Sequence, residues 1–281
     1  SVPVCGRDLT REMIDPARSR GLRVGLYHSL NNWSADPDGV AALEDPAARR
    51  RFVDDTHSRL IELADRYRPF DVMWYDGWWP FDASGWEAER MNAAIAARVP
   101  GVIFNGRNGL PGDFATPEGH LSPPKPWRAF EAAMCLNDSW GWHAGDENWK
   151  SPRQVVDLLA ACATRGGNLL LNVGPKPDGS LPEPATQTLE RVGAWLASYG
   201  EAIFDTERFT YELMEQVEPG QVASRGEWSF SGHYTARGND LYFIATRWPG
   251  GSFAIAGMET TVRSVRLLTR NDLQPRWHQE A

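Results

Sequence analysis

A carboxylate surrounded by aromatic rings is the arrangement in this chain with the clearest chemical use. The apolar run 70–76 ends in Asp76, and Trp74, Trp78 and Trp79 flank that acid. Such a run predicts a buried parallel strand, and barrel enzymes place their chemistry at the carboxyl ends of such strands. Aromatic faces stack on the C–H faces of a sugar ring, whose hydroxyls bind carboxylates, so the segment suits a carbohydrate site. An aspartate that only caps the next turn is the alternative interpretation.

Glycoside hydrolysis requires a second carboxyl group as proton donor beside the nucleophile, for which Asp76 is the candidate. Glu118 is our preferred donor, because it lies in a loop where Pro117 restricts the backbone. Glu131 is the rival acid; it could instead bind a substrate hydroxyl or hold a neighbouring loop. An exposed loop acid without a catalytic role is the other interpretation of Glu118.

Polar and aromatic residues also stand at the carboxyl ends of the other predicted strands. They are Tyr27, His28 and Ser29 at the end of the first strand, followed by Trp33; Asn105 at the end of the third, followed by Arg107; 137–142 after the fourth; and Asn172 at the end of the fifth. Because the carboxyl ends of parallel strands meet at one edge, we expect a shared active face. His28 is a candidate ligand contact, and a structural role for it is equally open.

Helical patterns alternate with short apolar runs over residues 1–204. The predicted strands are 22–29, 70–76, 101–105, 129–136 and 168–173, and the predicted helices are 8–20, 45–67, 87–98, 152–164 and 184–199. This alternation indicates an α/β domain with a parallel sheet, open or closed. Residues 205–281 instead predict a small antiparallel β domain, a partial sandwich, with strands at 228–234, 240–246, 252–255 and 262–268.

Composition excludes several other classes. The net charge of −8, from 29 basic and 37 acidic residues, argues against nucleic-acid binding through a basic surface. No apolar stretch approaches the roughly 18–20 residues that span a membrane. We expect no metal and no cofactor, because the sequence has no CxxC pair, no HxxxH pair and no phosphate-binding GK[ST] loop. No compartment is predicted, since the N-terminus carries neither a signal peptide nor an initiator methionine.

Five stretches together give the chain a family resemblance. They are residues 21–29 (GLRVGLYHS), 71–79 (DVMWYDGWW), 136–142 (LNDSWGW), 166–179 (GGNLLLNVGPKPDG) and 193–204 (GAWLASYGEAIF). On these motifs the chain resembles an α-L-fucosidase of glycoside hydrolase family 29, over nearly its whole length. The resemblance implies a (β/α) barrel followed by a β domain.

The resemblance also implies roles for individual residues. It implies a retaining double displacement on a terminal α-L-fucoside, either a fucosylated glycan or an aryl fucoside, with Asp76 as nucleophile and Glu118 as acid/base. Tyr27, Trp74 and Arg107 fall on positions that contact the fucose ring, and Trp140 on one that forms the pocket wall for its C6 methyl group. Arg107 would also help to keep Asp76 ionised.

The chain departs from the family at its N-terminus, where family members have further residues that supply the first barrel strands. We therefore expect an incomplete, TIM-like (β/α) barrel. Open strand edges and apolar surface favour association, so we expect a homo-oligomer whose neighbouring copy covers the gap. Closure with fewer strands, or a fragment that folds within an assembly, are the alternatives. The competing functions are a non-catalytic sugar-binding or scaffold protein of the same fold and a different exo-glycosidase.

Overall fold

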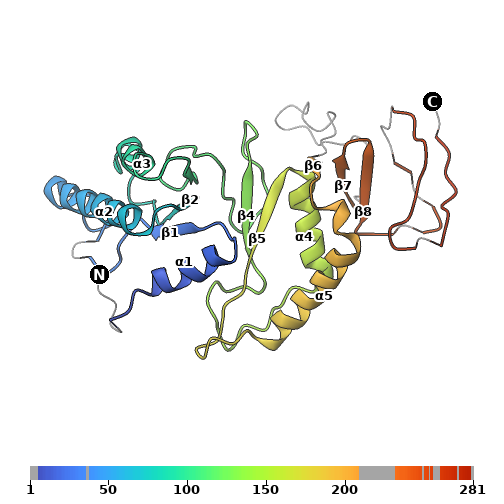
Figure 1. The fold of residues 1–281 in the computed structure, drawn as a ribbon, viewed down its shortest axis with the longest axis horizontal. Helices are drawn as coiled ribbons and strands as arrows, with labels where there is room; N and C mark the ends of the chain where they lie inside the picture. Colours follow the sequence, from blue (N-terminus) through green and yellow to red (C-terminus); the bar gives the residue numbers. More distant parts are fainter. Residues whose placement is uncertain are drawn as a thin grey trace. The chain divides into compact units, whose positions relative to one another are not determined.

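The computed structural model describes residues 6–35, 38–208, 232–248, 250–252, 254–255, 260–270 and 272–279. The chain divides into two compact units. Unit 1 comprises Ser1–Thr116 and Pro124–Ala129, and unit 2 comprises Pro117–Pro123 and Phe130–Ala281. Figure 1 shows the helices and strands of each unit.

Unit 1 alternates three helices with three parallel strands. In chain order these are α1 (Leu9–Ser19), β1 (Gly25–Ser29), α2 (Pro46–Tyr67), β2 (Val72–Asp76), α3 (Ala88–Ala96) and β3 (Ile103–Phe104). The strands form one sheet in the order β1-β2-β3. In the register of β1 and β2, Tyr27 pairs with Trp74 and Ser29 with Asp76. The carboxyl ends of these two strands therefore coincide.

Local sequence signals explain where the helices of unit 1 begin. The Asp8 side chain caps α1 by accepting a hydrogen bond from Arg11 N, and the Asp45 side chain caps α2 in the same way. The apolar face of α2 packs into the core of the unit together with Met73 and Tyr75, both fully buried. Because side chains alternate along a strand, the neighbouring Trp74 and Asp76 lie on the opposite face of the sheet.

Unit 2 contains a parallel strand pair and a small antiparallel sheet. Its elements are β4 (Phe130–Cys135), α4 (Pro152–Thr164), β5 (Gly167–Asn172), α5 (Glu183–Tyr199), the 3₁₀ turn η1 (Gly200–Ala202), β6 (Glu207–Arg208), β7 (Gly232–Arg237) and β8 (Asp240–Ala245). β4 pairs with β5 in parallel, whereas β6, β7 and β8 are antiparallel. Ser151 and Gln154 form a capping box at the start of α4.

The antiparallel sheet packs on the helices of its own unit. His233 Nε2 on β7 lies 2.9 Å from Asp157 Oδ1 on α4, and Thr235 Oγ1 donates to the carbonyl of Ala202 at 2.6 Å. The sheet therefore packs on α4 and η1 through these polar bonds from β7 and through the apolar side chains of Tyr242 and Ile244 on β8. The domain boundary at residue 204 stays a prediction.

The helices and parallel strands predicted for residues 1–204 are confirmed, with shifts of one to a few residues at their ends. The strands predicted at 252–255 and 262–268 are wrong: none of their described residues is in a strand. In the second segment, the backbone N–H of Val262 donates to the side chain of Gln279 at 2.9 Å instead of to a neighbouring strand. Of the strand predicted at 228–234, residues 228–231 lie outside the described residues, and the rest falls in β7.

The architecture is therefore mixed α/β with small sheets. Within the described ranges the sheets have three, two and three strands, and none closes into a barrel.

Candidate active site

Asp76 ends β2 with both carboxylate oxygens occupied by donors from neighbouring elements. The hydroxyl of Tyr27, on β1, donates to Oδ2 at 2.6 Å. Arg107 Nη1, beyond β3, donates to Oδ1 at 2.9 Å. Three consecutive parallel segments thus converge on one acid at the carboxyl edge of the sheet, as the polar strand ends predicted.

These contacts determine the charge of Asp76. Partial burial alone would raise the pKa of its carboxyl, but hydrogen bonds from Tyr27, the Gly77 backbone and Arg107, with the charge of Arg107, outweigh that effect. The net result is a lowered pKa, so Asp76 is a carboxylate at neutral pH. Gly77 makes its contact in a left-handed conformation, φ +62°, in which a Cβ would lie 2.5 Å from Ser29 Oγ.

Arg107 is itself held in place. Its Nε donates to Thr116 Oγ1 at 2.9 Å and its Nη2 to Thr116 O at 3.2 Å. Its Cζ lies 5.8 Å from the ring centroid of Trp74, and that ring contacts Phe114 at 5.7 Å. The guanidinium is therefore fixed by hydrogen bonds and packing before any ligand arrives.

Four of the five candidates in unit 1 meet on one face of the sheet, and His28 does not. Tyr27, Trp74 and Asp76 share that face, and Arg107 reaches it from beyond β3. His28 is paired with the core residue Tyr75, on the helix-covered face. Burial, with a smaller contribution from Arg59, lowers the pKa of His28 to about 4. Its enclosed Nδ1 has no hydrogen-bond partner among the described residues. Substrate contact by His28 stays a prediction, and this geometry does not favour it.

The structure gives positioning roles to three residues for which the sequence analysis proposed no such role. Thr116 and Phe114 orient Arg107 and Trp74, as described above. The fully buried Asn105 links β3 to β2: its Oδ1 accepts from Tyr75 N at 2.9 Å and its Nδ2 donates to Tyr75 O at 3.0 Å. Its place at a strand end was the only sequence signal for Asn105, and only tertiary structure brings Thr116 to Arg107.

Of the two candidate acids of unit 2, Glu131 lies within β4 and Glu118 lies beside it. Glu118 forms a parallel bridge to Ala133, with hydrogen bonds from Gly119 N to Ala133 O (3.0 Å) and from Ala133 N to Pro117 O (2.8 Å). Glu131 precedes Ala133 by two residues, so its side chain and that of Glu118 lie on the same face. Glu118 is exposed. Glu131 is half-buried, and burial raises the pKa of its carboxyl.

Trp140 lies in the loop after β4 with 46% of its surface exposed. Asn172, the last residue of β5, donates from Nδ2 to the Trp140 carbonyl at 2.7 Å. Gly174 passes so close to this loop that a Cβ would lie 2.5 Å from Trp142 N. The loop that carries Trp140 is thus anchored to the end of β5, while the indole is accessible.

Two further findings concern the described part of the chain. No helix there combines the length and apolarity needed to cross a membrane. No three His, Cys, Asp or Glu side chains among the same residues are grouped so that they could hold a metal ion.

Comparison with known proteins places the chain in a family. A model of the family described as Alpha-L-fucosidase matches residues 2–201, most of the chain. The protein therefore belongs to the α-L-fucosidase family, glycoside hydrolase family 29. It is 29% identical over 277 residues to the tissue α-L-fucosidase of Bos taurus, with 93% of this chain and 56% of the relative covered. The chain thus spans about half the length of the curated relatives that it matches.

Solved structures give the same assignment. α-L-Fucosidase isoenzyme 1 from Paenibacillus thiaminolyticus is 30% identical, with a TM-score of 0.78 over 97% of this chain and 69% of its own. A family 29 α-L-fucosidase from Bacteroides thetaiotaomicron is 26% identical, with a TM-score of 0.68 over 85% of this chain and 58% of its own. The latter is a Glu→Gln variant that holds a trapped covalent intermediate with 2-fluoro-fucosyl fluoride.

Proposed function

We propose that this protein hydrolyses terminal α-L-fucosides, in fucosylated glycans or aryl fucosides, as a retaining exo-glycosidase. Family membership supports the substrate class. The observation that carries the proposal is the state of Asp76: an ionised carboxylate at the end of a parallel strand, fixed by Tyr27 at 2.6 Å and Arg107 at 2.9 Å. A nucleophile must be unprotonated and oriented before substrate binds, and these contacts supply both conditions.

In the first step of the proposed mechanism, a carboxylate oxygen of Asp76 attacks the anomeric carbon of the fucoside. The bond to the leaving oxygen breaks as Glu118 gives it a proton, so the aglycone departs as an alcohol and a fucosyl ester remains on Asp76. Loss of negative charge from Asp76 weakens its ion pair with Arg107 and its hydrogen bond from Tyr27, whose hydroxyl can then bond the sugar.

In the second step, Glu118, now a carboxylate, removes a proton from water as the water oxygen attacks the anomeric carbon. The ester bond breaks, fucose leaves with its original anomeric configuration, and both carboxyl groups return to their starting states. The trapped covalent intermediate of the Bacteroides thetaiotaomicron relative, obtained with a Glu→Gln variant, supports this two-step route and the use of a glutamate.

Glu131 remains the rival acid. Its raised pKa favours the protonated form that an acid catalyst needs. Because Glu131 lies within β4, its backbone is held more rigidly than that of Glu118, whose side chain is exposed beside that strand. Glu118→Gln and Glu131→Gln separate the two acids. Removal of the acid catalyst slows the hydrolysis of fucosides with poor leaving groups much more than that of activated aryl fucosides. Only substitution of the residue that acts as the acid should give this difference.

Sugar binding is assigned to the remaining members of the site. Tyr27 and Trp74 share the face of Asp76, and we propose that they contact the fucose ring together with Arg107. Trp140 would provide an apolar wall for the C6 methyl group, which forms no hydrogen bond. The geometry of His28 supports a structural role for that residue instead.

The partial (β/α) barrel and its self-association belong to the same proposal. Both parallel sheets have the strand–helix order that such a barrel requires. β1 and β5 are edge strands in the described sheets. On β5, Leu170 is 43% exposed. An apolar side chain on an unpaired parallel edge favours coverage by another copy of the chain.

The direct test is release of the aglycone from an aryl α-L-fucoside. Asp76→Ala should lower kcat by about a thousandfold or more, as expected when a nucleophile is removed. Asp65→Ala is the matched control, because Asp65 pairs with Arg98 on the surface of unit 1. Equal turnover by the wild type and Asp76→Ala refutes the nucleophile assignment. Fucose binding without turnover in the wild type indicates the non-catalytic alternative, and hydrolysis of a different aryl glycoside indicates another exo-glycosidase.

A further inference from the structure

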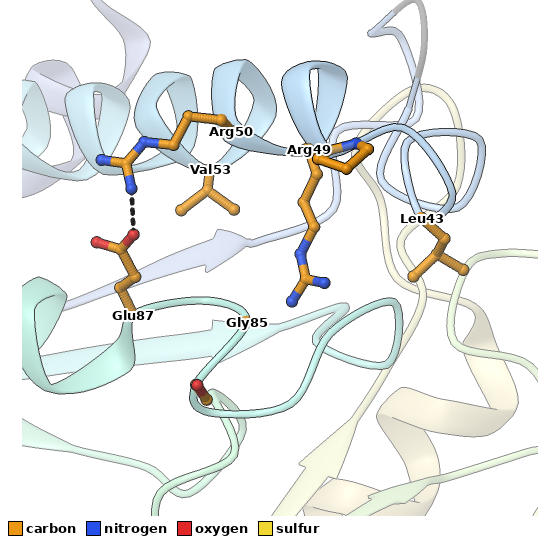
Figure 2. Close-up of a pocket in the computed structure, with 8 residues that line it drawn as sticks. Leu43, Arg49, Arg50, Val53, Gly85 and Glu87 are labelled. Carbon is orange, nitrogen blue, oxygen red and sulfur yellow. Dashed lines mark hydrogen bonds and ion pairs between the residues drawn. The ribbon is translucent and has the colours of Figure 1, made fainter.

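A cluster of charged residues lines a cavity in unit 1, apart from the contacts of Asp76. The cavity has a volume of about 240 Å³ and lies between the first turns of α2 and the loop that follows β2. Its polar lining comes from Arg49, Arg50, Ser84 and Glu87. Figure 2 shows the Arg49 side chain directed toward the loop at Gly85, whereas Arg50 turns away to Glu87. We call this space the Arg49 cavity.

The charged residues that line the Arg49 cavity are two arginines, Arg49 and Arg50, and one glutamate, Glu87. Arg50 pairs with Asp54 through two hydrogen bonds of 2.9 Å and also with Glu87. Arg90 pairs with Glu87 at 2.6 Å and with Asp54 at 3.3 Å. These two cations and two anions form a neutral network. Arg49 stands outside it: its backbone N–H bonds Asp45 O, but its guanidinium makes no hydrogen bond or ion pair with any described residue.

Arg49 is nevertheless held in place. Its Cζ lies 4.7 Å from the ring centroid of Phe81, which is buried and packs edge-on against Trp86 at 4.8 Å. On its other side Gly85 approaches so closely that a Cβ there would overlap Nη2. The neighbouring acid, Asp82, instead accepts the Gly85 backbone N–H at 2.6 Å. A half-buried guanidinium is thus preorganised, and the described residues leave its N–H donors unused.

We propose that the Arg49 cavity binds a tetrahedral oxyanion, a sulfate or phosphate group. The planar guanidinium of Arg49 can donate two parallel hydrogen bonds to two oxygens of such a group, and the Ser84 hydroxyl can donate to a third. The N–H groups of Ala47 and Ala48 are already taken by Asp45, so side chains must provide the binding. The cavity is smaller than the roughly 300–1,000 Å³ typical of drug-sized ligands, which leaves room for the anion with at most one sugar ring.

The position of the cavity connects this anion to the sheet. The segment before α2 follows the carboxyl end of β1, and the loop with Ser84 follows the carboxyl end of β2, where Asp76 lies. Both therefore leave the sheet at the edge that carries the candidate nucleophile. A sulfate or phosphate ester on a sugar and the free inorganic ion present the same oxygens to Arg49. Binding of either one does not require catalysis at Asp76.

The test is a titration of the protein with inorganic sulfate at constant ionic strength, followed by NMR or calorimetry. We expect saturable binding that Arg49→Gln weakens about tenfold or more, as loss of charge-assisted hydrogen bonds implies. Arg51→Gln removes the same charge from an exposed position on the same helix and should leave the affinity within about twofold. Gly85→Ala keeps every charge but crowds Nη2, so it should weaken binding as Arg49→Gln does.

Each outcome decides the proposal. Equal weakening by Arg49→Gln and Arg51→Gln, or no saturable binding by a wild type that is folded by circular dichroism, overturns it. Weakening by Arg49→Gln but not by Arg51→Gln supports it even where Gly85→Ala fails to fold. A sulfated monosaccharide that binds while its unsulfated form does not identifies a sugar ester as ligand, and binding of sulfate alone identifies the free ion.

Discussion

The Tyr27 hydroxyl donates a 2.6 Å hydrogen bond to Oδ2 of Asp76, from β1 to the neighbouring β2. Tyr27 pairs with Trp74 in the strand register, so the phenol reaches along the sheet to the strand end, two residues beyond its own partner. Of the contacts that lower the pKa of the Asp76 carboxyl, this bond has the largest effect; burial acts more strongly still, in the opposite direction. The pKa of the candidate nucleophile therefore depends in part on a tyrosine 49 residues away.

Tyr27→Phe should raise the pKa of Asp76 by removing that donor. A higher pKa leaves less carboxylate at acidic pH, so the acid limb of the kcat/KM profile should move to higher pH. The maximum should fall about tenfold to a hundredfold, the range expected for a hydrogen bond to a charged group. Tyr75→Phe is the control, because Tyr75 faces the core and bonds Asn92. An acid limb that moves equally in both variants would contradict the account.

Gly77→Ala should disturb Asp76 without removing any functional group. Gly77 has φ +62°, and an added Cβ would lie 2.5 Å from Ser29 Oγ. Gly101→Ala introduces the same kind of backbone strain at φ +85° with open space around the Cβ. We expect each variant to lose about 1–3 kcal/mol of unfolding free energy, but only Gly77→Ala to lose activity. Equal kcat values for the two variants would show that the turn does not position the acid.

His28→Leu should reduce the loss of stability in acid. The pKa of His28 is about 4 in the folded chain against 6.5 for the ordinary group. Above pH 6.5 both states are neutral; below it the unfolded state gains the proton first, and stability falls until the pH reaches about 4. At pH 5 this costs about 2 kcal/mol. Denaturant unfolding at pH 7.5 and pH 5 should show a smaller difference for His28→Leu. An unchanged difference would place the histidine in solvent.

Leu170→Lys tests the proposed self-association. Leu170 lies on the edge strand β5 with 43% of its surface exposed, and Leu181, 45% exposed, lies in the turn before α5. A charge on a strand edge opposes pairing with another chain. Light scattering should report an oligomer for the wild type and for Leu181→Lys, and a smaller species for Leu170→Lys. A monomeric wild type would eliminate the neighbouring copy as the cover of the open edge.

The sequence predicted the parallel strands and their helices because apolar runs and helical periods are local signals, bounded here by residues such as Gly21 and Pro152. It placed Asp76 and Arg107 on one active face from their positions at strand ends, and the family resemblance implied that Arg107 helps to keep Asp76 ionised. It also placed Tyr27 and His28 together, although adjacent strand residues face opposite sides. Packing against α2 decides which of the two faces the core.

The sequence did not reveal the residues that orient the site. Thr116 bonds Arg107 because the loop between them folds back, and such a loop has no sequence periodicity from which the contact could be predicted. The wrong strand at 262–268 shows the limit of strand propensity, which measures how well side chains suit a pleated surface. It cannot supply a partner strand, and Val262 bonds a glutamine side chain instead.

The most direct measurement is the site of covalent labelling by 2-fluoro-fucosyl fluoride, a reagent that slows breakdown of a fucosyl ester. After inactivation and digestion, mass spectrometry should find one fluorofucosyl group, on the Asp76 carboxylate, and Asp76→Ala should stay unlabelled. A label on another carboxylate, or rapid turnover of fucosides by Asp76→Ala, would contradict the assignment of Asp76 as nucleophile.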